Sequence, residues 1–335
     1  MPVHVINQTP FPHFAFRKLG YRGEHWFTVV VRVTCDIDPV TGQCSFSDEQ
    51  QPVIMADRYR NNPENSSLLT ETDLIFRKPR GEFYITGTAY TTDNIPQPQW
   101  IAGFTFGQLQ KQLTLSGPRF WSYHQGWKAD APAAVTALPL IYENAYGGHD
   151  ISGAYPANPV GTGWFSADNA DKSARYPLPR ITLPGSESVP PVFGMPWPVA
   201  GFGLYSRWWS PRLQYAGTYD NDWLENTRPY YPADFKPDFF MGAPADQQQE
   251  GYFAGNETLT IRGMFPEVAE ASFRLPEIGF FAVQDIPGEP LAPDDCVLDT
   301  VHLSLDERKL CLTWRYSLAD ILPGIPLQIH AYKLS

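Results

Sequence analysis

Regular alternation of apolar or β-branched residues with polar ones near both ends of the chain constrains its fold most strongly. Residues 26–37 alternate in this way, and the turn DPVTG leads from them back toward Cys44. Near the other end, residues 296–305 and 309–316 alternate as well and are joined by the short polar turn DER. Because side chains along a strand point to opposite faces in turn, these patterns predict two β-hairpins.

Three further runs in the first part of the chain have strand character, and a few short segments have helix signals. The runs 83–91, 100–106 and 111–116 are rich in β-branched and aromatic residues, and Gln108-Leu109 can turn the chain between the last two. They predict an antiparallel meander. The helix signals predict three short elements: 167–175 after Ser166, a turn from Pro244 to Gln249, and 318–322 after Ser317.

The middle of the chain, about 120–255, is dense in Pro, Gly, Trp and Tyr and shows neither helical nor strand periodicity. Such composition is typical of extended but ordered loops. We therefore expect a mainly β protein with an antiparallel, sandwich-like core and few short helices. It is expected to form one domain over 1–335, with β-rich ends 1–119 and 256–335 and a loop-rich middle 120–255.

Composition excludes several classes of function. Hydrophobic residues make up 43% of the 335 residues and aromatic residues 14%, enough apolar surface for a folded core. A net charge of −11 opposes nucleic-acid binding. No stretch reaches the roughly 20 apolar residues that a membrane span needs, and the N-terminus lacks an apolar signal core. We expect a cytoplasmic protein without membrane insertion.

The residues offer little support for cofactor or metal chemistry. The fragments Gly161-Thr162-Gly163 and Gly201-Phe202-Gly203 lack the third glycine of a dinucleotide-binding motif, and the seven histidines show no metal-ligand spacing. The four cysteines contain no C-x-x-C pair. Cys35 and Cys44 flank the first hairpin turn, so they are either reduced thiols or, in an oxidising compartment, a disulfide. We expect no cofactor, no metal and no catalytic residue.

One alternative is a carbohydrate-binding or glycoside-processing protein, because acidic pairs occur among aromatic residues in the middle region. Carboxylates and aromatic faces are the groups that glycoside-processing and carbohydrate-binding proteins use. The pairs are Asp220/Asp222 and Asp234/Asp238, and the aromatic residues are Trp208, Trp209, Trp223, Tyr230 and Tyr231. Aspartates in loops also commonly accept hydrogen bonds from nearby backbone amides, and we prefer that interpretation.

A series of short motifs runs through most of the chain in a characteristic order. They are Thr72-Asp73-Leu74, Lys78-Pro79, Gly87, Tyr90, Lys111, Leu113, Gly117, Arg119, Trp121, Tyr142-Glu143-Asn144-Ala145-Tyr146-Gly147-Gly148, Asn158-Pro159-Val160-Gly161-Thr162-Gly163, Trp209 with Pro211-Arg212, Ala216-Gly217-Thr218-Tyr219-Asp220 with Trp223, Pro232-x-Asp234-Phe235 and Ala243-Pro244-x-Asp246-Gln247. The series resembles a bacterial family, domain of unknown function 2169, that is encoded in type VI secretion clusters.

The resemblance implies a non-enzymatic effector adaptor or chaperone, which holds a toxin in the cytoplasm and helps to load it onto the secretion spike. Its partners would be the secreted effector and the spike protein. Tyr, Trp and Arg dominate protein interfaces. We therefore expect Trp208, Trp209, Arg212, Tyr230 and Tyr231, which cluster beside turn residues, to contribute to binding.

Overall fold

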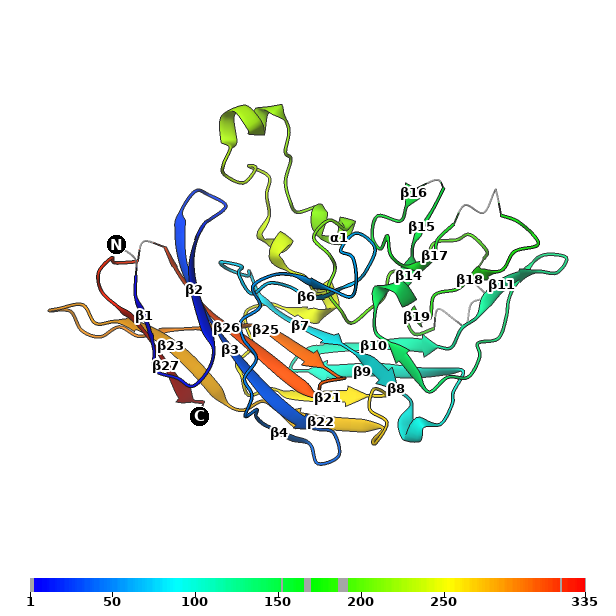
Figure 1. The fold of residues 1–335 in the computed structure, drawn as a ribbon, viewed down its shortest axis with the longest axis horizontal. Helices are drawn as coiled ribbons and strands as arrows, with labels where there is room; N and C mark the ends of the chain where they lie inside the picture. The colour runs from blue at the N-terminus through cyan, green and yellow to red at the C-terminus, as the bar shows by residue number, and fades with distance from the viewer. Residues whose placement is uncertain (1–2, 152, 166–169, 186–191, 320, 335) are drawn as a thin grey trace.

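A computed structural model of the chain describes residues 3–151, 153–165, 170–185, 192–319 and 321–334. The fold is mainly β, as expected (Figure 1). Its largest sheet has seven strands in the order β2-β3-β26-β25-β7-β20, with β4 paired to β3. Their bounds are β2 His13–Leu19, β3 His25–Asp38, β4 Gln43–Phe46, β7 Gly81–Thr86, β20 Gln248–Gln249, β25 Val297–Ser304 and β26 Lys309–Ala319. Strands from both ends of the chain therefore share one sheet.

Both predicted hairpins are confirmed. β3 pairs with β4, and β25 pairs with β26, each in the antiparallel sense. Cys35 lies opposite Phe46 and Cys44 opposite Ile37, so the two cysteines are diagonal neighbours, and both are free thiols. The prediction of a helix over 318–322 is wrong, because β26 continues through Ala319.

A five-stranded antiparallel sheet packs against one face of the large sheet. Its order is β19-β10-β9-β21-β22, with bounds Ile181–Thr182, Leu109–Ser116, Gln99–Phe106, Thr258–Arg262 and Glu270–Arg274. Phe83 of β7 meets Phe104 and Phe106 of β9, with ring centroids 4.7 and 5.0 Å apart. These contacts belong to one buried core that draws on both sheets, so the core has the expected sandwich-like form.

The predicted meander holds for only two of its three runs. β9 and β10 form an antiparallel hairpin, but Gly87 divides the 83–91 run into β7 and β8 (Thr88–Tyr90). β7 pairs in parallel with β25, while β8 pairs with β13 (Ala137–Pro139). A four-stranded sheet, β1-β27-β23-β24, lies beside the core, with bounds Val5–Asn7, Leu327–Lys333, Ile278–Gln284 and Asp294–Asp295.

Where the structure describes it, the middle of the chain consists mainly of loops, as predicted, together with short strands that were not predicted. Its strands are β11 Phe120–Tyr123, β12 Trp127–Ala129, β14 Tyr146–Gly147, β15 His149–Asp150, β16 Gly153–Ala154, β17 Thr162–Gly163 and β18 Tyr176–Pro177; β5 Arg58–Tyr59 and β6 Leu68–Thr70 lie earlier in the chain. The helical turns are η1 Thr92–Asn94, η2 Tyr142–Asn144, α1 Ser210–Leu213, η4 Trp223–Thr227, η5 Pro237–Phe240 and η6 Ala245–Gln247.

The expected helix over 167–175 is not supported. Residues 166–169 lie outside the described residues, and 170–175 contain turns but no helix. The turn expected after Pro244 is present as η6, which is followed directly by β20.

The second face of the large sheet carries buried polar side chains and is covered by the segment 51–76. On β3, Val29, Val31 and Val33 face the sandwich core, whereas Thr28 and Arg32 point the other way, as strand alternation requires. Arg32 pairs with Asp73, whose carboxylate also accepts a hydrogen bond from the Ile54 amide. Arg32, a member of this polar layer, also lines a surface cavity.

Candidate functional site

A segment that we call the arm, residues 217–234, projects from the body of the protein beside the β2–β3 hairpin (Figure 1). Its two ends are joined at the base. Asp234 accepts hydrogen bonds from the Thr218 amide and hydroxyl, at 2.9 and 2.8 Å. The amide of Lys236 donates to the Tyr215 carbonyl at 3.0 Å. The arm is thus a closed loop with a defined stem.

The far part of the arm is built from local contacts. The π-helical turn η4 begins at Trp223, whose indole nitrogen donates to the Tyr230 carbonyl at 2.8 Å and whose ring packs edge-on against Tyr219. These contacts leave apolar side chains exposed: Tyr219 is 53%, Leu224 50% and Tyr230 46% accessible. Tyr230 also lies over Gly23 in the β2–β3 turn, which supports the arm from the side.

Two of the predicted binding residues, Trp209 and Arg212, are buried and do not lie on the surface. Trp209 is 1% exposed and packs edge-on against Tyr142. Arg212 is 2% exposed, bonds to Glu71 at 2.7 Å and donates to the carbonyls of Tyr205 and Phe239. A buried charge needs such partners, so both residues hold the middle loops together and cannot contact a partner from there.

The other three predicted binding residues are accessible to different degrees. Trp208 is 43% exposed and stacks on Tyr59 with ring centroids 5.4 Å apart. Tyr230 is exposed on the arm, while Tyr231 is half-buried against Phe235 and Phe240. The structure therefore places Tyr230 on the arm, where Tyr219 and Leu224 are also exposed, and Trp208 on the body just before α1.

The acidic pairs that suggested glycoside chemistry are engaged in loop contacts. Asp220 accepts the Trp223 amide at the start of η4, and Asp222 accepts from the Asn226 side chain. Asp234 closes the arm, and Asp238 pairs with Arg80 at 2.6 Å. Asp220 and Asp234 thus accept backbone amides, as the sequence led us to expect, whereas Asp222 and Asp238 bind side chains. Within the described residues, no group of three or more His, Cys, Asp or Glu side chains could hold a metal ion.

Several motif residues from distant segments form buried polar clusters. Lys111 donates to Asp246 and Gln247, both at 2.8 Å. The Gln247 side-chain amide donates to the carbonyls of Phe83 and Phe202. Lys78 bonds to Glu82 and to Thr300, and Glu82 accepts the amides of Gly242 and Ala243. These residues satisfy buried backbone groups and so contribute to the fold.

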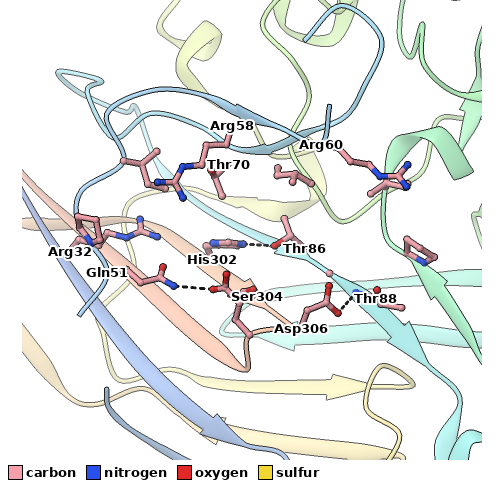
Figure 2. Close-up of a pocket in the computed structure, with 17 residues that line it drawn as sticks. Arg32, Gln51, Arg58, Arg60, Thr70, Thr86, Thr88, His302, Ser304 and Asp306 are labelled. Atoms are coloured by element: carbon pink, nitrogen blue, oxygen red, sulfur yellow. Dashed lines mark hydrogen bonds between the residues drawn. The ribbon is translucent and has the colours of Figure 1, made fainter. Parts of the chain in front are cut away.

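A cavity of about 630 Å³ lies between the segment 51–70 and the second face of the large sheet (Figure 2). Arg58, Arg60 and Thr70 approach it from the covering segment. Gln51 also belongs to this segment, whereas Arg32, Thr86, His302, Ser304 and Asp306 line the cavity from the sheet and its neighbouring turns. Sequence reasoning missed this site because its residues come from separate segments and form no motif.

The electrostatics of the cavity are set by its arginines and by a neutral histidine. Burial, together with the positive charge of Arg32, lowers the pKa of His302 to about 3. The His302 ring stacks on Tyr84 at 4.3 Å between centroids, and its Nε2 lies 2.7 Å from the Thr86 hydroxyl. Arg60 is 3.9 Å from Glu143, whereas the guanidinium of Arg58, whose backbone pairs with Thr70, has no hydrogen bond or ion pair among the described residues.

Comparison with known proteins identifies a family. The chain belongs to the family described as an uncharacterized protein conserved in bacteria, DUF2169, and the match covers residues 22–315. No curated protein and no solved structure gave a significant match. Among the described residues, no helix is both long and apolar enough to cross a membrane.

Proposed function

We propose that this protein is a non-enzymatic adaptor of type VI secretion. It binds a cognate toxin effector in the cytoplasm and helps to load it onto the secretion spike. The partner class comes from the resemblance of the motif series to proteins encoded in secretion clusters. The observation that carries a binding role is the arm, an ordered projection that exposes Tyr219, Leu224 and Tyr230.

The arm combines exposed apolar side chains with an ordered backbone. Exposed apolar groups that cluster on one surface commonly mark interaction sites. Because the stem and the η4 turn already hold the arm in shape, a partner would lose little conformational entropy on binding it. Trp208 adds a large, partly exposed aromatic ring held on Tyr59. Aromatic side chains of this kind often provide most of the binding energy at interfaces.

The proposal is tested by co-purification with the toxin encoded beside the gene. Leu224→Glu places a charge on an exposed apolar side chain of the arm, and Trp208→Ala removes the exposed indole. Each change is expected to weaken capture at least about tenfold, since losing one central interface side chain costs on the order of 2 kcal/mol. Val40→Glu, in the exposed β3–β4 turn, is the matched control and should capture toxin normally.

The results can distinguish an error in the proposed adaptor role from an error in the proposed contact surface. If the wild-type protein captures neither the toxin nor the spike protein, the adaptor proposal is wrong. If it captures the toxin and both folded variants do so equally well, the adaptor role stands but the arm and Trp208 are not the contact surface. Capture that is also lost in Val40→Glu would show that any added surface charge disturbs the complex.

A further inference from the structure

The cavity beneath the segment 51–70 gathers polar atoms that have no partner elsewhere. Arg32, Thr70 and His302 all line it, and each has a buried polar atom without a hydrogen-bond partner in the described ranges: Nε, Oγ1 and Nδ1. Arg32 and His302 are 3% and 6% exposed. A buried polar group without a partner costs about 1–3 kcal/mol, so three around one cavity are unusual for a purely structural arrangement.

The residues that line the cavity carry several hydrogen-bond donor groups. Arg32 and Arg58 carry guanidinium groups, and Thr70 and Ser304 carry hydroxyls. His302 is a neutral imidazole, because burial holds its pKa at about 3. When the Thr86 hydroxyl donates to Nε2, the ring proton lies on Nδ1, which is buried and has no partner in the described ranges. The cavity therefore favours a ligand that accepts hydrogen bonds.

The charge balance limits the ligand to a weakly charged anion. The lining contains Arg32, Arg58 and Arg60, but also Asp306 and Glu307. Arg32 is paired with Asp73 and Arg60 lies near Glu143, so Arg58 is the arginine of the lining with no acidic partner among the described residues. A dianionic phosphate would meet the two carboxylates and the field of a chain with net charge −11. A single carboxylate fits this balance better.

Apolar residues complete the lining and indicate what the anion is attached to. Ile54, Leu69 and Ile141 border the cavity, and its volume of about 630 Å³ exceeds what one carboxylate needs. We propose that the cavity binds a carboxylate joined to a small apolar group, with Arg58 as its main ionic partner. Two sources carry such a carboxylate, a free acid and the end of a peptide chain, and the experiment below distinguishes them. The proposal is independent of the adaptor role.

The test measures the melting temperature of the full protein at constant ionic strength with four probes. N-acetylleucine represents a peptide end, isovalerate a free acid, N-acetylleucinamide the same peptide group without the charge, and inorganic phosphate the dianion. N-acetylleucine should raise the melting temperature, because a ligand that binds only the folded state stabilises it. The amide and phosphate should have little effect. Isovalerate distinguishes the two sources of the carboxylate. If it raises the melting temperature as much as N-acetylleucine does, a free acid is sufficient for binding. If it causes no rise, the peptide group is needed for binding.

Two variants locate the effect. Arg58→Gln should weaken the response to N-acetylleucine about tenfold, since a charge-assisted hydrogen bond is lost. Arg22→Gln, an exposed arginine in the β2–β3 turn, should respond like wild type. The His302 ring gives a signal in proton–carbon NMR spectra that can be assigned by its loss in His302→Gln. This signal should shift when N-acetylleucine is added. Equal stabilisation by phosphate, an unchanged response in Arg58→Gln, or no response up to roughly 20 mM would each overturn the proposal.

Discussion

At the scale of single residues, burial decides the role of the charged side chains, and Arg212 is the clearest case. Its residue type suggested an interface, because Arg is frequent there. Inside the protein its guanidinium instead meets Glu71, which lies 141 positions earlier in the chain. Nothing near either residue in the sequence indicates this partner. The exposed Tyr230, in contrast, was predictable from its position among turn residues.

The pairing of Glu71 predicts a pH dependence of stability. Although burial opposes its ionisation, the charges of Arg212, Lys78 and Arg207 hold its pKa at about 2, below the usual 4.5. A carboxylate whose pKa is lowered by folding makes its full contribution to the free energy of unfolding above pH 4.5. This contribution, roughly 3 kcal/mol, is lost as the pH falls from 4.5 toward 2. Urea unfolding between pH 6 and 3 should show this loss in wild type.

Two variants make that measurement specific to Glu71. Glu71→Gln should be less stable than wild type at pH 6, because Arg212 stays buried without a charged partner, and its stability should fall less steeply below pH 4.5. Glu270→Gln breaks an exposed ion pair with Arg262 and should follow the wild-type curve. An identical acid slope in wild type and Glu71→Gln would contradict the prediction.

At the scale of elements, the two longest motifs of the middle region fold against each other. β14 and β17 pair in parallel, joining Tyr146 with Thr162. Between them, the buried Asn158 side chain donates to the carbonyls of Tyr142 and Tyr146, at 2.9 and 3.0 Å. Glycines and prolines indicated ordered turns here, but composition carries no information about which turns are neighbours. A Cβ at Gly147 would lie 2.1 Å from the Asn158 carbonyl oxygen, which explains that glycine.

Removing the Asn158 amide should loosen this pair of motifs. Asn158→Ala removes two buried hydrogen bonds, and the Tyr142 carbonyl keeps the Ala145 amide as a donor, so we expect a cost of about 1–3 kcal/mol in total. Hydrogen exchange of backbone amides in 142–163 should therefore become faster, while β3 and β26 keep their protection. Asn226→Ala, which removes an exposed contact with Asp222 on the arm, is the control and should leave 142–163 unchanged. Unaltered exchange in 142–163 of Asn158→Ala would show that the amide is dispensable.

At the scale of the whole molecule, strand patterns in the sequence indicated β3, β9, β10, β25 and β26, whereas β2, β21, β22, β23 and β27 were not predicted. The patterns did not indicate the neighbours of β7. β7 lies beside β25, pairing Phe83 with Val301, because both strands present apolar side chains to the same core. The cavity escaped prediction for a similar reason, since its lining meets only after distant segments are folded together. Long-range pairing of this kind is a property of tertiary packing.

A core shared between distant segments predicts cooperative unfolding. The main buried cluster includes Trp100 from β9, Trp209 before α1 and Trp314 from β26. Urea transitions followed by tryptophan fluorescence and by far-ultraviolet circular dichroism should therefore coincide. Trp208→Phe removes the signal of an exposed indole and should not move the midpoint. A fluorescence change that clearly precedes the loss of strand signal would mean that the middle region unfolds separately.

The closed stem of the arm has an evolutionary consequence. Because Asp234 and Thr218 join its ends and most of its contacts are internal, the residues between them can vary while the sandwich stays intact. The sequence of such a loop can be replaced without changing the rest of the fold. Transplanting 219–233 from one family member into another would then transfer recognition without redesigning the scaffold, provided that the contact with Gly23 is kept. Diversification of partners within a lineage could proceed by replacement of this short segment alone.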